Sequence, residues 1–403
     1  MNSTSFIAKK LSNIKPSATL AVTSKALELK AKGIDIISLG AGEPDFDTHE
    51  TIKDAAIEAI NSGFTKYTAV SGIKELKEAI REKFQRDNNL TFDLDQITVG
   101  NGAKQLIYNA FMATIDPDDE VIIPAPYWVS YPDMVELCDG KPVIVECTKE
   151  QNYLLTATQL ERAISYKTKW VILNSPSNPT GMTYSAEQLS DLLKVIAKFP
   201  NIMVLSDDIY EHVIYENFAV KTPAEVMPHL KDRILTINGV SKCYAMTGWR
   251  IGFAGGNKAL IKAMNVIQSQ STSNACSISQ IASAVALNSD QNYIADRNKV
   301  FKERRDLSVE VFNNIDGVSA SKPSGAFYIF PNIDGLIGKK TKDGTIISDS
   351  STFATILLEV ANVAVVPGSA FGSENHFRIS YALDTESLEE ALRRIAKFCN
   401  ELT

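Results

Sequence analysis

The segment SKCYAMTGWRIG, residues 241–252, places Lys242 just after an apolar run and Arg250 eight positions further on. A lysine at the end of a buried strand is partly desolvated, which lowers the pKa of its amine and leaves some of it unprotonated. An unprotonated amine can bond to an aldehyde, and an arginine supplies a fixed positive charge for a phosphate. This spacing therefore predicts a site for pyridoxal phosphate, with a surface lysine beside a Gly-Trp turn as the alternative.

Short apolar runs extend outward from this segment in a regular series. They cover residues 96–99, 120–123, 141–145, 170–173, 202–205, 233–237 and 252–255. Between two of these runs, residues 186–198 carry leucine and isoleucine at the spacing of one helix face. Short buried strands that alternate with helices predict an α/β fold with a mostly parallel sheet.

The last third of the chain has a different pattern. A long helix is expected over about 288–314, short strands at 326–329, 363–366 and 377–380, and a final helix near 387–399. This order predicts a smaller α+β domain. We therefore expect an N-terminal arm with part of the small domain over residues 1–47, a large cofactor-binding domain over 48–290 and a small C-terminal domain over 291–403.

Composition limits the class of protein. The chain has 403 residues, of which 44% are hydrophobic and 22% charged, as in a globular protein with a large core. A net charge of −7 without a long basic run argues against nucleic acid and acidic membranes as partners. Nowhere do about 18 apolar residues follow one another, and the first residues lack the apolar core of a signal peptide, so we expect a cytoplasmic protein.

The cysteines and histidines point to no metal. Five cysteines are scattered without a C-x-x-C pair, and the four histidines show no ligand spacing. These patterns argue against a disulfide framework, a zinc site and a Ser-His-Asp triad.

Polar clusters follow five of the expected strands. They are residues 100–104, 126–128, 174–179 and 206–210, and Lys242 itself. The carboxyl ends of parallel strands meet at one edge of a sheet, where ligands of such folds bind. The five strand ends therefore predict one shared site.

The first cluster lies in the turn VGNGAKQ, residues 99–105. This turn follows a strand and opens a helix, so its backbone N–H groups point to where an anion would sit. Taken alone, it could equally be an ordinary strand-to-helix connection.

Three residues of the other clusters suit the ring of the cofactor. Asp207 follows a buried strand, where an unpaired carboxylate is costly to desolvate and a protonated pyridine nitrogen would remove that cost. Tyr210 can reach from the next turn toward the phenolic oxygen of the cofactor. Asn178, in a loop stiffened by two prolines, can donate to the same oxygen and to a substrate carboxylate. Each of these residues could by itself be a strand-end cap or a turn residue.

Arg378 alternates with apolar neighbours in an expected strand. An arginine that points inward requires a planar anion, and the α-carboxylate of an amino acid matches its two-pronged guanidinium group. Arg378 is therefore the expected anchor of the substrate.

In their order and spacing, these motifs resemble the class I pyridoxal-phosphate-dependent aminotransferases from about residue 15 to the C-terminus. The resemblance implies the fold type I architecture, with Lys242 as the covalent holder of the cofactor and the acid and base of the reaction. It also implies a phosphate cradle at Gly102 and Ala103, and a Gly42 backbone that contacts the substrate because a side chain would block its approach. Trp128 would stack on the cofactor ring, although its indole N–H could instead meet a carbonyl of the core.

Tyr67 lies in the segment TKYT, residues 65–68. It resembles the residue by which a neighbouring subunit reaches the phosphate. The implication is a homodimer with shared active sites.

The sequence departs from the better-known aspartate aminotransferases at two places. Gly239 stands where some of them carry a phosphate-binding hydroxyl, and residues 268–274 contain no clear equivalent of the partner-chain arginine that recognises the distal carboxylate. Lys104 could replace that arginine. Together with Lys15 and Thr19 it resembles the bacterial aspartate aminotransferases that also act on prephenate, although Lys15 and Thr19 could instead cap the following helix.

The resemblance implies a ping-pong transamination between L-aspartate and 2-oxoglutarate, giving oxaloacetate and L-glutamate, and also the conversion of prephenate to arogenate. An aromatic or broad-specificity aminotransferase, or another enzyme on the same fold such as a β-lyase, would share the cofactor residues. A non-catalytic aminotransferase-like module, as in some transcription regulators, is disfavoured because Lys242 is intact and no DNA-binding domain precedes residue 15.

Overall fold

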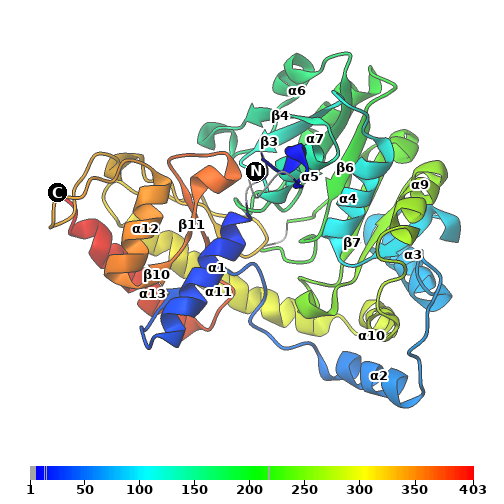
Figure 1. The fold of residues 1–403 in the computed structure, drawn as a ribbon, viewed down its shortest axis with the longest axis horizontal. Coiled ribbons are helices and arrows are strands. Elements are labelled where there is room, and N and C mark those ends of the chain that lie inside the picture. Colours follow the sequence, from blue (N-terminus) through cyan, green and yellow to red (C-terminus); the bar gives the residue numbers. More distant parts are fainter. Residues whose placement is uncertain (1–5, 13, 15, 217) are drawn as a thin grey trace.

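The computed structural model describes residues 6–12, 14, 16–216 and 218–403. Figure 1 shows two parts: a large sheet with helices packed around it, and a smaller group that contains α1, α11, α12 and α13. No helix of the described residues combines the length and the apolar character needed to cross a membrane.

The strands are β1 Ile37–Ser38, β2 Ile97–Gly100, β3 Glu120–Ala125, β4 Lys141–Glu146, β5 Thr168–Asn174, β6 Met203–Asp207, β7 Ile234–Gly239, β8 Gly252–Gly255, β9 Tyr328–Ile329, β10 Val363–Ala364, β11 Val366–Pro367 and β12 Phe377–Ser380. The α-helices are α1 Ala18–Ala31, α2 Glu50–Asn61, α3 Lys74–Asn88, α4 Ala103–Thr114, α5 Ser130–Leu137, α6 Ala157–Ala163, α7 Ala186–Ala197, α8 Pro223–Val226, α9 Lys258–Ser269, α10 Ser277–Asn288, α11 Asn292–Asn313, α12 Ser350–Ala361 and α13 Thr385–Asn400.

The large sheet has seven strands in the order β2-β8-β7-β6-β5-β3-β4. Strands β3, β4, β5, β6 and β7 run parallel to one another, whereas β8 is antiparallel to both of its neighbours, β2 and β7. All seven strands expected from the apolar runs are present, so the mostly parallel sheet is confirmed. The reversal of β8 was not expected.

Both faces of this sheet are buried except at the edge strand β4, which explains why its other strands read as continuous apolar runs. In β5, Trp170 and Ile172 belong to the apolar cluster that includes residues of α4, α5 and α9, whereas Val171 and Leu173 belong to the cluster that includes residues of α3, α6, α7 and α10. Successive side chains of a strand point to opposite faces, so apolar residues are favoured at successive positions of such a strand.

The expected amphipathic helix over 186–198 is α7. Its start is fixed by a capping box, in which the Ser185 hydroxyl accepts from the Gln188 backbone and the Gln188 side chain accepts from the Ser185 N–H. Its buried face consists of Leu189, Leu192, Leu193, Val195 and Ile196. The local sequence thus sets both the start of this helix and the face that it buries.

The C-terminal part contains a three-stranded antiparallel sheet in the order β11-β12-β9, together with α11, α12 and α13. Strand β1 pairs in parallel with β10, so the N-terminal arm packs with the C-terminal part of the chain. The domain boundaries at 47/48 and 290/291 stay a prediction.

Two expected elements differ in detail. The helix expected over 288–314 consists of the end of α10 and of α11, which begins at Asn292. The strand expected over 363–366 is interrupted at Val365, because β10 pairs with β1 and β11 pairs with β12. A strand that changes partners cannot keep one continuous ladder.

Candidate active site

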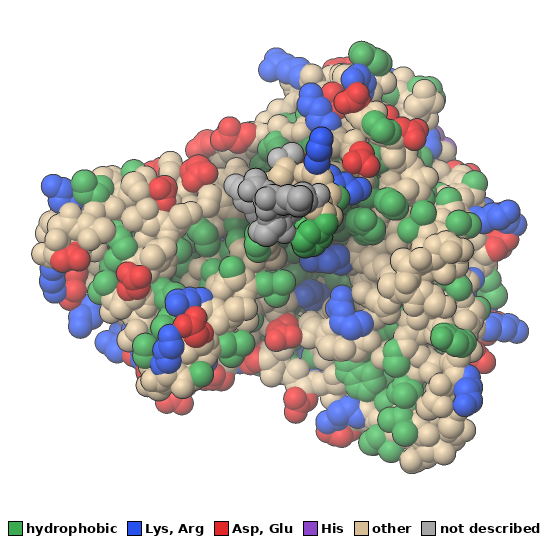
Figure 2. Space-filling view, in the orientation of Figure 1, with side chains coloured by type: hydrophobic (Ala, Val, Ile, Leu, Met, Phe, Trp, Pro, Cys, Tyr) green, Lys and Arg blue, Asp and Glu red, His purple; other side chains and the backbone are tan. Residues whose placement is uncertain are grey.

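A cavity of about 250 Å³ lies at the carboxyl ends of β2, β3, β5, β6 and β7. Figure 2 shows a hollow between the two parts of the molecule, with lysine and arginine side chains inside it. The structure brings eleven of the predicted site residues to this cavity: Thr19, Gly42, Ala103, Lys104, Trp128, Asn178, Asp207, Tyr210, Lys242, Arg250 and Arg378.

The other three predicted residues lie elsewhere. Gly102 directly precedes Ala103 and lies against the guanidinium group of Arg250. Tyr67 is 91% exposed and does not line the cavity. Lys15 lies outside the described residues.

Lys242 lies three residues beyond the end of β7, and its side chain is enclosed by the cavity. Its Nζ donates to the carbonyl oxygen of Gly42 at 2.5 Å and lies 5.7 Å from the centre of the Tyr210 ring. Burial, helped by the positive charge of Arg378, lowers the pKa of Lys242 to about 8. A useful fraction of this amine is therefore unprotonated near neutral pH, as a nucleophile or base requires.

Asp207 is the last residue of β6, and its carboxylate is buried. Its Oδ2 accepts a hydrogen bond of 2.6 Å from the Tyr131 hydroxyl, and its Oδ1 accepts a longer one, 3.4 Å, from the Ile209 N–H. Burial raises the pKa of Asp207, while the Tyr131 hydrogen bond acts in the opposite direction. A positive charge in the cavity would hold this carboxylate in its ionised form.

Arg250 and the turn before α4 form one corner of the cavity. Arg250 has a left-handed backbone, with φ 57°, and its side chain donates to the carbonyl oxygens of Thr247 at 3.0 Å and Asn101 at 3.2 Å. Gly102 has φ 81° and ψ 162°, a conformation that is restricted to glycine. The start of α4 and the guanidinium group of Arg250 thus lie side by side, which suits a phosphate.

Another wall of the cavity contains Arg378, which is 1% exposed. Its guanidinium group donates to Asn178 Oδ1 at 3.0 Å and to the Gly40 carbonyl oxygen at 2.7 Å, and it lies 4.5 Å from the centre of the Tyr328 ring. Its Nε has no hydrogen-bond partner among the described residues. Because a buried donor of this kind costs free energy, the arrangement suits an anion.

Lys104 and Trp128 lie together at another wall of the cavity. Lys104 Nζ donates to the Ser130 hydroxyl at 3.0 Å and lies 4.7 Å from the centre of the Trp128 ring. Burial, together with the positive charge of Arg250, lowers the pKa of Lys104. A negative group between Lys104 and Arg250 would offset both the burial and the repulsion between the two positive charges. This part of the cavity therefore suits a second carboxylate or a phosphate.

Two functional residues were missed by the sequence analysis. Tyr131 supports Asp207, and Tyr328 shares a hydroxyl contact of 2.8 Å with Tyr210. A Cβ atom on Gly42 would approach the Tyr328 hydroxyl to 2.9 Å, so the two positions are coupled. In a sequence, such tyrosines look like ordinary core residues. Only their contacts in the structure, Tyr131 with Asp207 and Tyr328 with Tyr210, indicate a link to the site.

Comparison with known proteins places the chain in a family. The family model described as "Aminotransferase class I and II" matches residues 34–395. The probable aspartate/prephenate aminotransferase of Rickettsia felis is 56% identical over 399 residues, which cover 99% of this chain and 98% of the relative. The aspartate/prephenate aminotransferase of Cereibacter sphaeroides is 54% identical over 398 residues, which cover 99% and 100%.

Solved structures agree with this result. The crystal structure of the aspartate aminotransferase from Rhizobium meliloti has a TM-score of 0.96 and 54% identity, with coverage of 98% of this chain and 99% of that one. The aspartate aminotransferase from Thermus thermophilus with maleate has a TM-score of 0.91 and 42% identity, with coverage of 97% and 99%. The expected fold and family are confirmed: this chain belongs to the class I and II aminotransferases, which use pyridoxal phosphate.

Proposed function

We propose that this enzyme transfers the amino group between L-aspartate and 2-oxoglutarate, and that it also converts prephenate to arogenate. The observation that carries the proposal is that Lys242, Asp207 and Arg378 face one cavity from three different elements. The relatives named for aspartate and prephenate, and the related structure with maleate, a dicarboxylate, support the substrate class.

Pyridoxal phosphate fits the residues of the cavity. Arg250 and the turn at Gly102 and Ala103 would hold the phosphate, because glycine at 102 leaves the room that a Cβ would fill. Asp207 would pair with the ring nitrogen and Lys242 would bond to the aldehyde carbon. When bound, the cofactor supplies an electron-withdrawing ring that makes the Cα proton of the substrate acidic.

The protein residues have separate tasks in the reaction. Arg378 binds the α-carboxylate of the substrate, and Asn178 holds the guanidinium group in that orientation. Lys242 Nζ takes the proton from the substrate Cα as a base and, once protonated, returns it as an acid. Asp207 keeps its negative charge throughout, and Tyr210 and Trp128 would hold the ring from its oxygen edge and its face.

We assign the distal carboxylate of aspartate, glutamate and prephenate to Lys104, with Thr19 at the rim of the cavity. Lys15 belongs to the same proposal on the basis of the sequence resemblance alone. An ammonium group that faces a carboxylate in an enclosed site favours dicarboxylates over monocarboxylic amino acids.

The first test is the variant Lys242→Ala. We expect it to lose turnover but to bind pyridoxal phosphate non-covalently, because Arg250 and the turn before α4 remain. Measured turnover at the normal rate would refute the assignment of Lys242. A panel of amino donors with 2-oxoglutarate and with prephenate then separates the proposed activity from a broad-specificity aminotransferase, and product analysis separates it from a β-lyase.

We also infer a homodimer in which Tyr67 reaches the phosphate of the partner subunit. Tyr67 is exposed in the single chain, as a residue that serves another subunit would be. Mixing inactive Lys242→Ala chains with impaired Tyr67→Ala chains should restore part of the activity, because one site of each mixed dimer carries neither defect. No recovery after verified subunit exchange would place Tyr67 outside the partner's site.

We further infer a cytoplasmic location. All five cysteines are free in the structure, as expected in a reducing compartment.

A further inference from the structure

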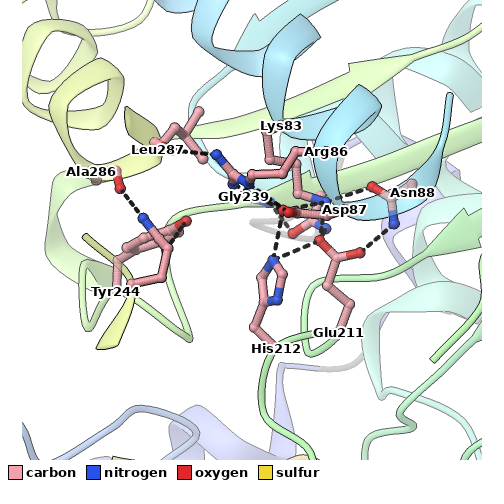
Figure 3. A network of polar contacts seen from close by, with 12 residues as sticks. Lys83, Arg86, Asp87, Asn88, Glu211, His212, Gly239, Tyr244, Ala286 and Leu287 are labelled. Atoms are coloured by element: carbon pink, nitrogen blue, oxygen red, sulfur yellow. Dashed lines mark hydrogen bonds and ion pairs between the residues drawn. The ribbon is translucent and has the colours of Figure 1, made fainter. Parts of the chain in front are cut away.

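A cluster of polar side chains lies outside the cavity, among α3, the turn after β6 and β7. Figure 3 shows five of its members, Lys83, Asp87, Asn88, Glu211 and His212. We call it the Glu211 cluster. Its members are Lys83, Asp87 and Asn88 of α3, Glu211 and His212 of the turn after β6, and Asn238 of β7.

Glu211 is the centre of this cluster. Its Oε1 accepts from Asn238 Nδ2 at 2.7 Å and forms an ion pair with Lys83, and its Oε2 accepts from Asn88 Nδ2 at 2.8 Å. His212 Nε2 lies 3.2 Å from the same Oε1. Four groups from three different segments thus converge on one carboxylate, which fixes its position more tightly than a single contact could.

The centre of the cluster is buried, whereas Asp87 and His212 at its edge are partly exposed. Lys83 is 1% and Glu211 6% exposed, and the ion pair lowers the pKa of Glu211 although burial alone would raise it. Asp87, Glu211 and His212 are close enough together to suggest a metal site, but the Lys83 ammonium group already binds the Glu211 carboxylate. The arrangement is therefore a closed set of protein contacts, with no ligand required.

The turn after β6 depends on these side chains. Asp207 ends the strand, and residues 208–213 follow as two successive turns, with backbone hydrogen bonds from Glu211 to Asp208 and from Val213 to Tyr210. Tyr210 lines the cavity, while the next residue, Glu211, points away from it into the cluster. The ion pair of Glu211 with Lys83 and its hydrogen bonds from Asn88 and Asn238 therefore hold the turn, residues 208–213, against α3 and β7.

We propose that Glu211, paired with Lys83, is a positioning residue that sets the Tyr210 hydroxyl and the Asp207 carboxylate against the cofactor. This inference rests on the proposed roles of Asp207 and Tyr210. Loss of the anchor would let the turn shift by a fraction of an ångström, and the two side chains on its other side would move with it.

The test uses the full-length holoenzyme and the double variant Lys83→Met/Glu211→Gln, which removes both charges together and leaves side chains of similar size. Single removal would leave a buried charge without its partner and could unfold the protein. The matched control is Leu76→Ala, which loosens the packing of α3 about two helical turns before Lys83.

Three quantities are measured besides the unfolding midpoint. They are the dissociation constant of pyridoxal phosphate, the pH at which the absorbance of the bound cofactor changes, and kcat and KM for aspartate. We expect the double variant to remain folded, to bind the cofactor about tenfold more weakly and to shift the absorbance titration, with kcat lowered about a hundredfold and KM little changed. Leu76→Ala should lower the unfolding midpoint without these effects.

The inference is overturned if the double variant keeps the cofactor affinity and the absorbance titration of the wild type. If it does not fold, Asn88→Ala, which removes one neutral donor to Glu211, decides by the same two measurements. Asp207→Ala is measured in parallel. If Asp207→Ala also leaves both quantities unchanged, the proposed cofactor site itself is wrong; if it changes them and the double variant does not, only the role of Glu211 is wrong.

Discussion

Replacing Tyr131 with phenylalanine removes one oxygen atom and tests how Asp207 is kept ionised. The hydroxyl donates to Asp207 Oδ2 at 2.6 Å, and the second hydrogen bond that the carboxylate accepts from the described residues, from the Ile209 N–H, is long, at 3.4 Å. A hydrogen bond to a charged acceptor contributes about 1.5 to 3 kcal/mol. Its loss should therefore raise the pKa of Asp207 further above its ordinary value.

The expected consequence is a slower chemical step. A carboxylate that is harder to ionise stabilises the positive ring less, so the single-turnover rate with aspartate should fall about ten- to a hundredfold. The phenylalanine ring keeps the packing of Tyr131 against Trp128, so the unfolding midpoint should change little. Rapid mixing of holoenzyme with aspartate, followed by absorbance, measures the rate.

Tyr184→Phe is the matched control. It removes another buried tyrosine hydroxyl, which accepts from the Leu155 N–H at 2.9 Å and makes no contact with Asp207. Tyr184→Phe should keep the single-turnover rate of the wild type. A Tyr131→Phe enzyme that also keeps this rate would show that burial and the cofactor alone hold Asp207 ionised, and the argument from the hydrogen bond would be refuted.

Three further predictions concern Gly102 beside Arg250, Lys104, and His212 of the Glu211 cluster. Gly102→Ala should weaken binding of pyridoxal phosphate by tenfold or more, as measured by equilibrium titration. The reasons are that a Cβ would come within 2.3 Å of Arg250 Nη2 and that φ at this position is +81°. Unchanged binding would exclude the turn from the phosphate site. Lys104→Ala should lower kcat/KM for aspartate and prephenate about ten- to a hundredfold more than for alanine or phenylalanine; an equal loss on all four would mean that Lys104 supports the phosphate turn instead. Burial lowers the pKa of His212, but Glu211 and its other acidic neighbour outweigh this effect and raise the pKa from 6.5 to about 9. Since the folded pKa lies above the ordinary value, this stabilisation is complete below pH 6.5 and is lost as the pH rises through about 9. His212→Gln should therefore remove up to about 3 kcal/mol of the fall in unfolding free energy between about pH 6 and pH 10 in urea titrations; an unchanged pH profile would contradict the pairing of His212.

The large sheet could be predicted from the sequence because its strands are buried on both faces. Runs such as 170–173 are apolar at every position, and polar clusters follow them directly. The antiparallel direction of β8 could not be predicted, because a buried strand has the same apolar pattern in either direction. The interruption at Val365 depends on two different partner strands, one of which lies in the N-terminal arm.

The candidate site, too, could be predicted from the sequence only in part. Lys242, Asp207 and Asn178 stand next to strand ends, so their shared location follows from the rule that the carboxyl ends of parallel strands meet. Arg378 was expected to bind an anion because it alternates with apolar residues. The contact of Tyr131 with Asp207 joins residues 76 positions apart, and that of Tyr210 with Tyr328 joins residues 118 apart. No local pattern in the sequence indicates contacts between residues so far apart.

The sequence by itself determined the elements, the family and the residues that stand at strand ends, because periodicity, turns and strand-end motifs are local properties of the chain. Only the tertiary structure decided which distant side chains form hydrogen bonds and ion pairs with one another. Lys83 and Glu211 are 128 positions apart, and each alone reads as an ordinary charged residue of a helix or a turn. They become an ion pair because the packing of α3 against the turn after β6 buries both of them, and a buried charge is stable only beside its partner.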